Sequence, residues 1–415
     1  MNQNKEENYS SLSYIQHTAS RFLDHETIGG LLLIFATIFA LVLGNSPWAE
    51  AYHHYLQDEF LFQLTDHFSF GLSVEEWIND GLMAIFFLVA GLELKREIMV
   101  GELTSLKKAS MPLLAALGGM VVPALLFASL NAYTNTSGGW GIPMATDIAY
   151  SLGIIGLLGK RIPAQLKIFL VALAIADDLG AILVIALFYS HEISTAFLGS
   201  GLGVFALLLL CNRLGLKNLA WYILGGIIMW YFFLNSGIHP TIAGVLFAVT
   251  IPVRPKLDSK LLAQRTSINI KKLEKTDIEN RDPMEDRRQR KILRSIKRDT
   301  ENSRPPLLKL ENSLINFNAF IIIPIFAIAN AGVKLDVSLS EVLGSSLGLG
   351  ILLGLAAGKA IGISLFSFLG VKLGISELHP TLRWKQIIGM GMIAGIGFTM
   401  SLFVTNLAFT DPELI

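Results

Sequence analysis

The chain has 415 residues, of which 52% are hydrophobic and 16% are charged, with no formal net charge and a mean hydropathy of +0.54. A soluble domain carries roughly 25% charged residues, so this composition excludes a soluble globular protein and predicts an all-α polytopic membrane protein. The single cysteine, Cys211, excludes a disulfide framework and a cysteine-based metal site.

Residues 1–26 are polar and lack an apolar core after a basic start, which predicts a cytoplasmic tail and not a cleaved signal peptide. Eleven apolar segments follow, several of them interrupted by Gly or Pro, and each is a candidate membrane span. They lie near residues 28–45, 77–94, 111–130, 140–158, 164–189, 196–212, 219–234, 238–252, 314–331, 346–370 and 386–409.

The connections between these segments alternate in basic charge. Connection 45–74 has no Lys or Arg, the next carries Lys95, Arg96, Lys107 and Lys108, and the alternation continues along the chain. By the positive-inside rule the N-terminus is cytoplasmic, and the C-terminus, after eleven spans, is expected on the opposite side.

Two connections are unusually long. Residues 253–306 separate a membrane domain of eight spans (27–252) from one of three (307–415), and seventeen Lys and Arg lie between Arg254 and Lys309. We expect a disordered or partly helical cytoplasmic loop, with binding of anionic lipid or a partner as the alternative. The aromatic-rich region 47–70 is either a small extracytoplasmic element used in homodimerisation or a simple surface connection.

Two adjacent carboxylates, Asp177 and Asp178, lie in the middle of the apolar stretch 171–188. A charged Asp at the centre of a membrane helix costs roughly 2.5–3.5 kcal/mol, and neighbouring carboxylates also repel each other. Adjacent helix positions point about 100° apart, so one carboxylate can face a water-filled cavity while the other faces a neighbouring helix. This arrangement suits a site where a cation and a proton compete for the same oxygens.

Two other stretches predict broken helices. Asp147 lies in 138–150, which has three glycines and a proline, and residues 393–401 are also interrupted by glycine. One such segment in each half indicates inverted repeats around a binding site at the midplane. Asp147 either offsets the positive helix N-termini of the breaks or caps a short helix. Lys359 either offsets the negative C-termini, pairs with one of the two aspartates, or extends to an interface.

Three further ionisable residues lie nearer the ends of spans. His239 is read as a boundary residue, with a proton-sensing role as the alternative. Asp80 and Glu93 flank the apolar run 81–92, one near each membrane face. Each is either a functional residue or an ordinary interfacial residue.

These charges belong to a recognisable set of stretches, which occur in one order from about residue 20 to the C-terminus. With them the chain resembles the NhaA-type sodium/proton antiporters, a family with inverted repeats and two broken, crossing helices. The stretches are 77–87, 91–97, 145–149, 176–181, 326–332, 358–359 and 395–401.

The resemblance implies that Asp178 is the main sodium ligand, while Asp177 exchanges a proton and pairs with Lys359. Thr146 and Asp147 would lie on one broken helix, which crosses the other near residues 395–398. The resemblance also implies Na⁺, Li⁺ and H⁺ as substrates, a multi-pass place in the bacterial inner membrane, a role in pH and sodium homeostasis, and no cofactor. It implies a pH response at three residues of a cytoplasmic funnel: Glu93, Arg96 and Glu311.

The chain departs from the family pattern at several positions. Asn312 and Ile315 stand where the best-known members have histidine, and Phe317 where tryptophan is usual, so the family's pH sensing is not carried over with these residues. The family normally has twelve spans, whereas this sequence stops at Ile415, where the last helix is expected to begin.

Three other functions fit the sequence less well. A proton-coupled carrier of an organic substrate would want aromatic or Arg side chains near the site, where the deep segments offer small aliphatic ones. A passive cation channel seldom needs a buried Lys beside its carboxylates. An intramembrane aspartyl protease needs its two Asp on different helices, and no Gly-x-Gly-Asp motif is present. We therefore expect a transporter and not an enzyme, and no nucleic-acid partner.

Overall fold

The computed structural model describes residues 28–65, 68–190, 193–277, 287–335 and 338–409. The predicted cytoplasmic tail and the last six residues lie outside these ranges. Each of the eleven apolar segments contains helix. Among the described residues, seven helices are long and apolar enough to cross a membrane, or nine if two bent pairs each count as one span. The other two segments form the shorter apolar helices α9 (Leu219–Leu234) and α10 (Thr241–Thr250).

The first half of the bundle runs from an unlabelled helix, Ile28–Gly44, to α10. A single span, Val74–Val100, is made of α3, a π-helical turn and α4. The helices in this half are α2 (Ala49–Gln57), α3 (Val74–Glu76), η1 (Trp77–Leu82), α4 (Met83–Val100), η2 (Glu102–Thr104), α5 (Leu106–Asn131), η3 (Ser137–Met144), α6 (Ile148–Leu158), η4 (Gly159–Arg161), α7 (Ala164–Phe188) and α8 (Thr195–Arg213).

The second half begins after the long charged loop. Its spans are Pro306–Asn330, Ser346–Lys372 and the bent pair α18–α19. The helices are α13 (Pro306–Phe317), η5 (Asn318–Ile322), α14 (Ile323–Asn330), α15 (Leu339–Gly344), α16 (Ser346–Leu353), η6 (Gly354–Gly358), α17 (Lys359–Lys372), α18 (Trp384–Ala394) and α19 (Phe398–Ala408).

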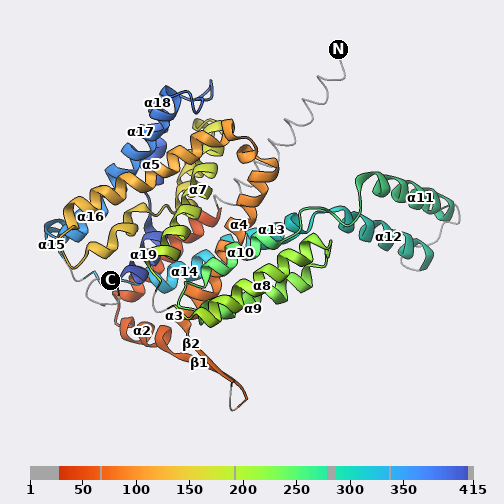
Figure 1. Cartoon of the computed structure of the whole chain (residues 1–415), viewed down its shortest axis with the longest axis horizontal. Helices are drawn as coiled ribbons and strands as arrows, with labels where there is room; N and C mark the ends of the chain where they lie inside the picture. The colour runs from red at the N-terminus through yellow and green to blue at the C-terminus, as the bar shows by residue number, and fades with distance from the viewer. Residues whose placement is uncertain (1–27, 66–67, 191–192, 278–286, 336–337, 410–415) are drawn as a thin grey trace.

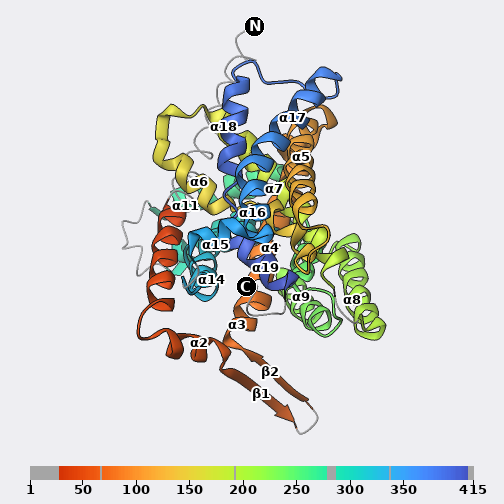
Figure 2. The same cartoon turned by 90° about the vertical axis from the view of Figure 1, so that its left-hand side faces the viewer.

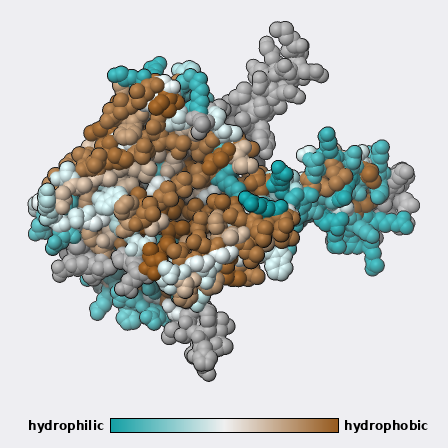
Figure 3. Space-filling view, in the orientation of Figure 1, coloured by the Kyte–Doolittle hydropathy of each residue, from teal (hydrophilic) through white to brown (hydrophobic). Residues whose placement is uncertain are grey.

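Small residues bring the spans into close contact. Helix α5 packs along α17, and a Cβ on Gly118 would lie 2.2 Å from the carbonyl oxygen of Gly362. Helix α4 packs on α10 in the same way, since a Cβ on Gly244 would lie 2.1 Å from the carbonyl oxygen of Ala84. Such contacts are typical of helices that associate within a bilayer. Hydrophobic residues cover much of the bundle surface in Figure 3.

Two elements project from the bundle in different directions (Figures 1 and 2). Region 47–70 contains α2 and most of an antiparallel hairpin of β1 (Glu59–Thr65) and β2 (Phe68–Ser73), with Glu59 paired to Ser73. Region 253–306 contains α11 (Ser259–Asp277) and α12 (Arg287–Ser303), which pack on each other and carry a hydrophilic surface in Figure 3. The described part of this loop is therefore mostly helical.

Two spans are broken near the centre of the bundle. Between η3 and α6 the chain is extended at residues 145–147, and between α18 and α19 it is non-helical at residues 395–397, where the helices bend by 50°. Three other spans contain a single π-helical turn, at η1, η5 and η6. π-turns often mark functional positions because they shift the register of the side chains that follow. Lys359 is the residue directly after η6.

Candidate functional site

The two broken spans cross each other at their breaks. The backbone amide of Asp147 donates to the carbonyl of Ile396 at 2.7 Å, and the hydroxyl of Thr146 donates to the carbonyl of Ala394 at 3.0 Å. One turn into α6, the hydroxyl of Ser151 donates to the carbonyl of Ile393 at 3.1 Å. The orphan carbonyls at the C-terminal end of α18 are thus satisfied by the opposite broken span.

Asp147 lies between the N-terminal ends of α6 and α19. Its Oδ1 accepts from the amide of Tyr150 at 3.0 Å, and its Oδ2 accepts from the amide of Thr399 at 3.2 Å and from the Thr399 hydroxyl. The side chain therefore caps its own helix and also reaches the facing helix, so both readings of Asp147 describe its geometry. A carboxylate is favourable here because helix N-termini carry partial positive charge.

Lys359 is fully buried, and its Nζ lies 2.6 Å from Oδ2 of Asp177. The same ammonium group donates to the hydroxyl of Thr146. It thereby joins α17 to α7 and to the broken span of α6. Pairing with a carboxylate and a hydroxyl offsets the desolvation of a charge that would otherwise be costly in this position.

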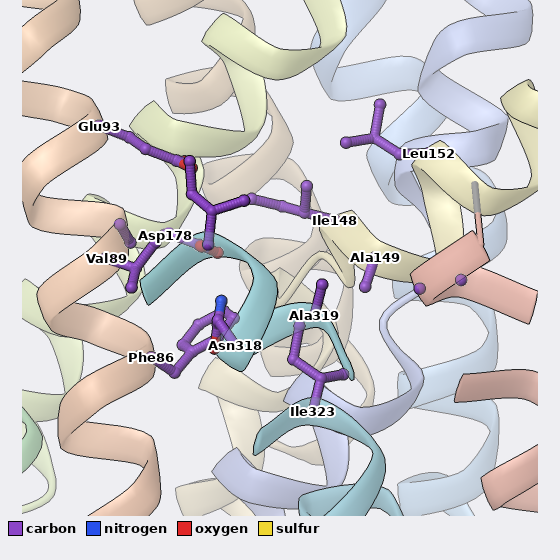
Figure 4. A pocket seen from close by; sticks show the side chains of 14 residues that line it. Phe86, Val89, Glu93, Ile148, Ala149, Leu152, Asp178, Asn318, Ala319 and Ile323 are labelled. Carbon is purple, nitrogen blue, oxygen red and sulfur yellow. The ribbon is translucent and has the colours of Figure 1, made fainter. Parts of the chain in front are cut away.

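Asp178 faces a different direction from Asp177. It lines a cavity of about 90 Å³ with Glu93 and Asn318, and the other lining residues have apolar side chains or are glycine. Figure 4 shows Asp178 between Glu93 and Asn318, with the amide nitrogen of Asn318 on the side of Asp178. Oδ2 of Asp178 is buried and has no hydrogen-bond partner among the described residues. Oδ2 of Asp177 is thus engaged by Lys359, whereas Oδ1 of Asp177 and Oδ2 of Asp178 have no hydrogen-bond partner among the described residues.

A second, smaller cavity of about 10 Å³ touches Asp147 and Thr399. Phe86, Ile148 and Ile323 line both cavities, so these apolar side chains lie between the Asp178 cavity and the helix crossing.

A charged cluster lies at the end of α4. Nε of Arg96 is 2.8 Å from Oε1 of the buried Glu311 on α13, and Nη1 of Arg96 is 3.3 Å from Oε1 of Glu97. Lys95 donates to the carbonyls of Val249 and Ile251, each at 2.6 Å, and so caps the C-terminal end of α10. The ion pair joins α4 to α13 one turn from Glu93, which lines the Asp178 cavity.

Comparison with known proteins shows the family of the chain. The sequence model of the family described as Na+/H+ antiporter 1 matches residues 20–414. The chain belongs to this family. With its apolar helices it is therefore a multi-pass bacterial membrane protein.

Family relatives align with almost the whole chain. A protein named Na(+)/H(+) antiporter NhaA from Christiangramia forsetii is 72% identical over 98% of this chain and 91% of its own length. One of the same name from Helicobacter pylori strain P12 is 46% identical over 100% of this chain and 92% of its own. Na(+)/H(+) antiporter NhaA 2 of Helicobacter hepaticus is 44% identical over 96% of this chain and 90% of its own length. By name these family members are transporters.

All the site residues expected from the sequence fall into two neighbouring groups. Thr146, Asp147, Asp177 and Lys359 meet at the helix crossing, while Asp178 and Glu93 line the cavity, with Arg96 and Glu311 next to Glu93. Of the positions that depart from the family pattern, Ile315 lines the cavity, whereas Asn312 and Phe317 are exposed.

His239 and Asp80 are closer to each other than their sequence positions suggest. Nε2 of His239 lies 3.5 Å from Oδ1 of Asp80, and the imidazole packs edge-on against the ring of Phe403. The His239 side chain is only 11% exposed, so it is more buried than a plain boundary residue. Its predicted proton-sensing alternative stays a prediction.

Several polar residues of the site were not singled out from the sequence. Thr399 binds Asp147, and Asn318 lines the Asp178 cavity. A chain of side-chain amides joins η1, α14 and α19, since Asn406 donates to Asn330 at 3.0 Å and Asn330 donates to Asn79 at 2.9 Å. Asn79, Asn330 and Thr399 lie in stretches that carry the family resemblance, whereas the only sequence signal for Asn318 and Asn406 is a polar residue within an apolar span.

Proposed function

We propose that the chain exports cytoplasmic sodium, and lithium, in exchange for external protons by alternating access around Asp177 and Asp178. The observation that carries this proposal is the division of labour between two adjacent carboxylates. Asp177 is paired with Lys359, whereas Asp178 lines a cavity and its buried Oδ2 has no hydrogen-bond partner among the described residues. The names of the relatives, 72% and 46% identical, support sodium/proton exchange.

The cycle follows from competition for the same oxygens. A small hard cation that enters the cavity binds carboxylate oxygen at Asp178, and its charge replaces that of Lys359 as a partner for Asp177. After the site opens to the other side, protons bind the carboxylates and the cation leaves. Since cation and protons bind the same groups, each excludes the other, and the protonated, neutral pair returns. Thr146 and Asp147 hold the crossing in place during this cycle.

Orientation and surroundings follow from the distribution of basic residues. The cytoplasmic N-terminus, expected from the positive-inside rule, places Glu93 and its cluster on the cytoplasmic side, in the bacterial inner membrane. The cavity then serves as the cytoplasmic entry, and Glu93, Arg96 and Glu311 adjust its electrostatics with pH. We also propose a homodimer through region 47–70, which α2 and the β1–β2 hairpin occupy.

Everted membrane vesicles provide the test. In vesicles that hold a pH gradient, added sodium or lithium should collapse the gradient with the wild-type protein and not with Asp178→Asn. Asp258→Asn, an exposed change at the base of the α11–α12 hairpin, should behave as wild type. Unchanged transport by Asp178→Asn would end the proposal. A wild type that ignores sodium, lithium and potassium would favour a proton-coupled carrier of an organic substrate.

A further inference from the structure

The α11–α12 hairpin carries an excess of positive charge that the rest of the chain balances. Region 253–306 contains sixteen Lys and Arg and nine Asp and Glu, although the whole chain has no formal net charge. The hairpin that carries this excess projects away from the bundle (Figure 1). Within it the charge is concentrated in α12, where seven of seventeen residues are basic and two are acidic.

Four basic side chains form a single stripe along α12. They follow one another at intervals of four, three and four residues, which places them on one face of a helix. All four are exposed: Arg287, Lys291, Arg294 and Arg298. The opposite face carries Ile292, Ile296 and Asp299, which are partly or fully buried where α12 packs on α11. We call the four exposed residues the basic stripe.

The acidic residues of α12 are used within the hairpin and its base. Asp299 is buried, and its Oδ1 lies 3.5 Å from Nη1 of Arg265 on α11. Glu301 lies 3.7 Å from Nη1 of Arg304 and 3.6 Å from Nζ of Lys309. In the part of the chain that the structure describes, no acidic side chain forms an ion pair with the basic stripe. Its charge is therefore available to a partner.

The base of the hairpin is fixed at the end of a membrane span. Helix α12 ends at Ser303, and the span Pro306–Asn330 begins three residues later. The amide of Leu307 donates to the carbonyl of Pro252 at 3.2 Å, so both strands of the connection are held together there. At 1.5 Å per residue α12 is only about 25 Å long. The stripe thus starts within a few residues of the membrane boundary.

We infer that the basic stripe of α12 docks on anionic lipid headgroups of the membrane that holds the bundle. Clusters of four to eight Lys and Arg beside a membrane span have the charge that such headgroups attract. This inference does not depend on the ion that the bundle transports.

Exposed aliphatic side chains favour lipid over a soluble acidic partner. Leu261, Ile268 and Leu293 are 41%, 54% and 47% exposed, and Figure 3 shows hydrophobic residues among the hydrophilic ones on this hairpin. Helices that combine basic and aliphatic side chains are suited to the headgroup region of a bilayer. Region 253–306 contains no aromatic residue, whereas proteins that bind single-stranded nucleic acid stack bases on aromatic side chains.

Two dependences follow from an electrostatic contact. Each basic residue near an anionic surface strengthens binding about fivefold, so loss of all four should abolish docking. Salt should release the hairpin as well, because charges are screened beyond about 3 Å at about 1 M ionic strength.

The test measures how close the hairpin lies to the lipid in the full-length protein. A donor dye is placed at Ser267→Cys in a Cys211→Ser background, since Ser267 is exposed on α11 and lies outside the stripe. Energy transfer to a headgroup-labelled lipid is compared in nanodiscs of phosphatidylcholine with and without phosphatidylglycerol. Transfer should increase with phosphatidylglycerol, and the increase should be lost in about 1 M potassium chloride.

Two charge variants of the labelled protein decide whether the stripe is responsible. The stripe variant should lose most of the increase, and it combines Arg287→Gln, Lys291→Gln, Arg294→Gln and Arg298→Gln. The matched control removes the same number of exposed basic residues near the ends of other spans and should keep the increase: Arg161→Gln, Lys372→Gln, Arg383→Gln and Lys385→Gln.

Amide hydrogen exchange over residues 287–303 provides a readout without a label. In the wild type it should be slower in the discs with phosphatidylglycerol, and it decides the question if a labelled protein does not reconstitute. Equal energy transfer in neutral and anionic discs, or the same increase in the stripe variant as in the wild type, would overturn the inference. Protection that requires an added acidic polypeptide or nucleic acid, and not anionic lipid, would overturn it in favour of a soluble partner.

Discussion

Nζ of Lys359 lies 2.6 Å from Oδ2 of Asp177, whereas Asp178, the next residue of the same helix, lines a cavity, and its Oδ2 has no hydrogen-bond partner among the described residues. The two carboxylates are neighbours in sequence, but the turn of about 100° between them gives each a separate environment. The lysine neutralises one carboxylate in the absence of a cation and leaves the other available. A cation bound at Asp178 and the ammonium group of Lys359 then compete for electrostatic interaction with the carboxylate of Asp177.

Removal of the lysine leaves a buried carboxylate without its cation. We expect Lys359→Ala to lose on the order of 3–5 kcal/mol of unfolding free energy, since a broken buried ion pair exposes the remaining charge to an apolar environment. Thermal unfolding of the purified protein in detergent measures this loss. The pH dependence of the transport rate of Lys359→Ala should also shift relative to wild type. Lys372→Ala, at the exposed C-terminal end of the same helix, is the matched control and should be near neutral.

The double variant Lys359→Ala, Asp177→Asn separates the ion pair from simple packing. With the charge of Asp177 gone as well, the loss in stability should be smaller than for Lys359→Ala alone. If the double variant is less stable by the sum of the two single changes, and the pH profile of Lys359→Ala is unaltered, the pair has no coupling and this account of Lys359 is wrong.

Competition between sodium and protons should appear as a dependence of the sodium KM on pH. Below the pH at which the aspartate pair takes up its first proton, each unit of acidification should raise the apparent KM about tenfold per competing proton, by simple mass action. The maximal rate at saturating sodium should change much less than the KM. Initial rates of ²²Na⁺ uptake into everted vesicles between pH 6.5 and pH 8.5 measure both quantities. A KM that does not change with pH would exclude shared ligands.

The contact between Asp147 and Thr399 ties the two broken spans together. Thr399→Val keeps the shape of the side chain and removes the hydroxyl that donates to Oδ2 of Asp147, so we expect a loss of ~1–3 kcal/mol in unfolding free energy. Thr405→Val is a suitable control, because the Thr405 hydroxyl donates to a carbonyl of its own helix, at Ser401. Equal melting temperatures of the two variants would mean that the crossing does not depend on this bond.

Much of the fold follows from the hydropathy pattern and from the positions of glycine and proline. Each apolar segment is helical, and the breaks at 145–147 and 395–397 lie within the two glycine-interrupted stretches. Glycine and proline weaken a helix locally, so a break can be located from sequence alone. The cost of buried charge also singled out Asp147 and Lys359 before any contact was known.

Other features depend on tertiary contacts that sequence does not encode locally. The choice of Asp177 over Asp178 as partner of Lys359 is set by the packing of α17 against α7 and by the register shift at η6. The π-turns have no clear residue signature, so the position of Asn318 could not be predicted. A neutral polar residue in a long apolar span carries little penalty, so the contacts of Asn330 with two other asparagines do not follow from the sequence, although Asn330 lies in a stretch that carries the family resemblance.

The α11–α12 hairpin offers a test of what the transport machinery requires. Its two ends meet where the amide of Leu257 donates to the carbonyl of Asn302 at 2.9 Å, so a short linker can replace residues 259–300 without strain on the bundle. Since α11 and α12 pack on each other and project away from the helix crossing, we expect sodium/proton exchange within about twofold of wild type after excision, a factor that corresponds to under ~0.5 kcal/mol. Everted vesicles with equal amounts of both proteins measure this. Loss of exchange by an excised protein that still inserts and folds would show that the charged loop takes part in the cycle. If exchange by the wild type depends on anionic lipid and exchange by the excised protein does not, the loop binds anionic lipid.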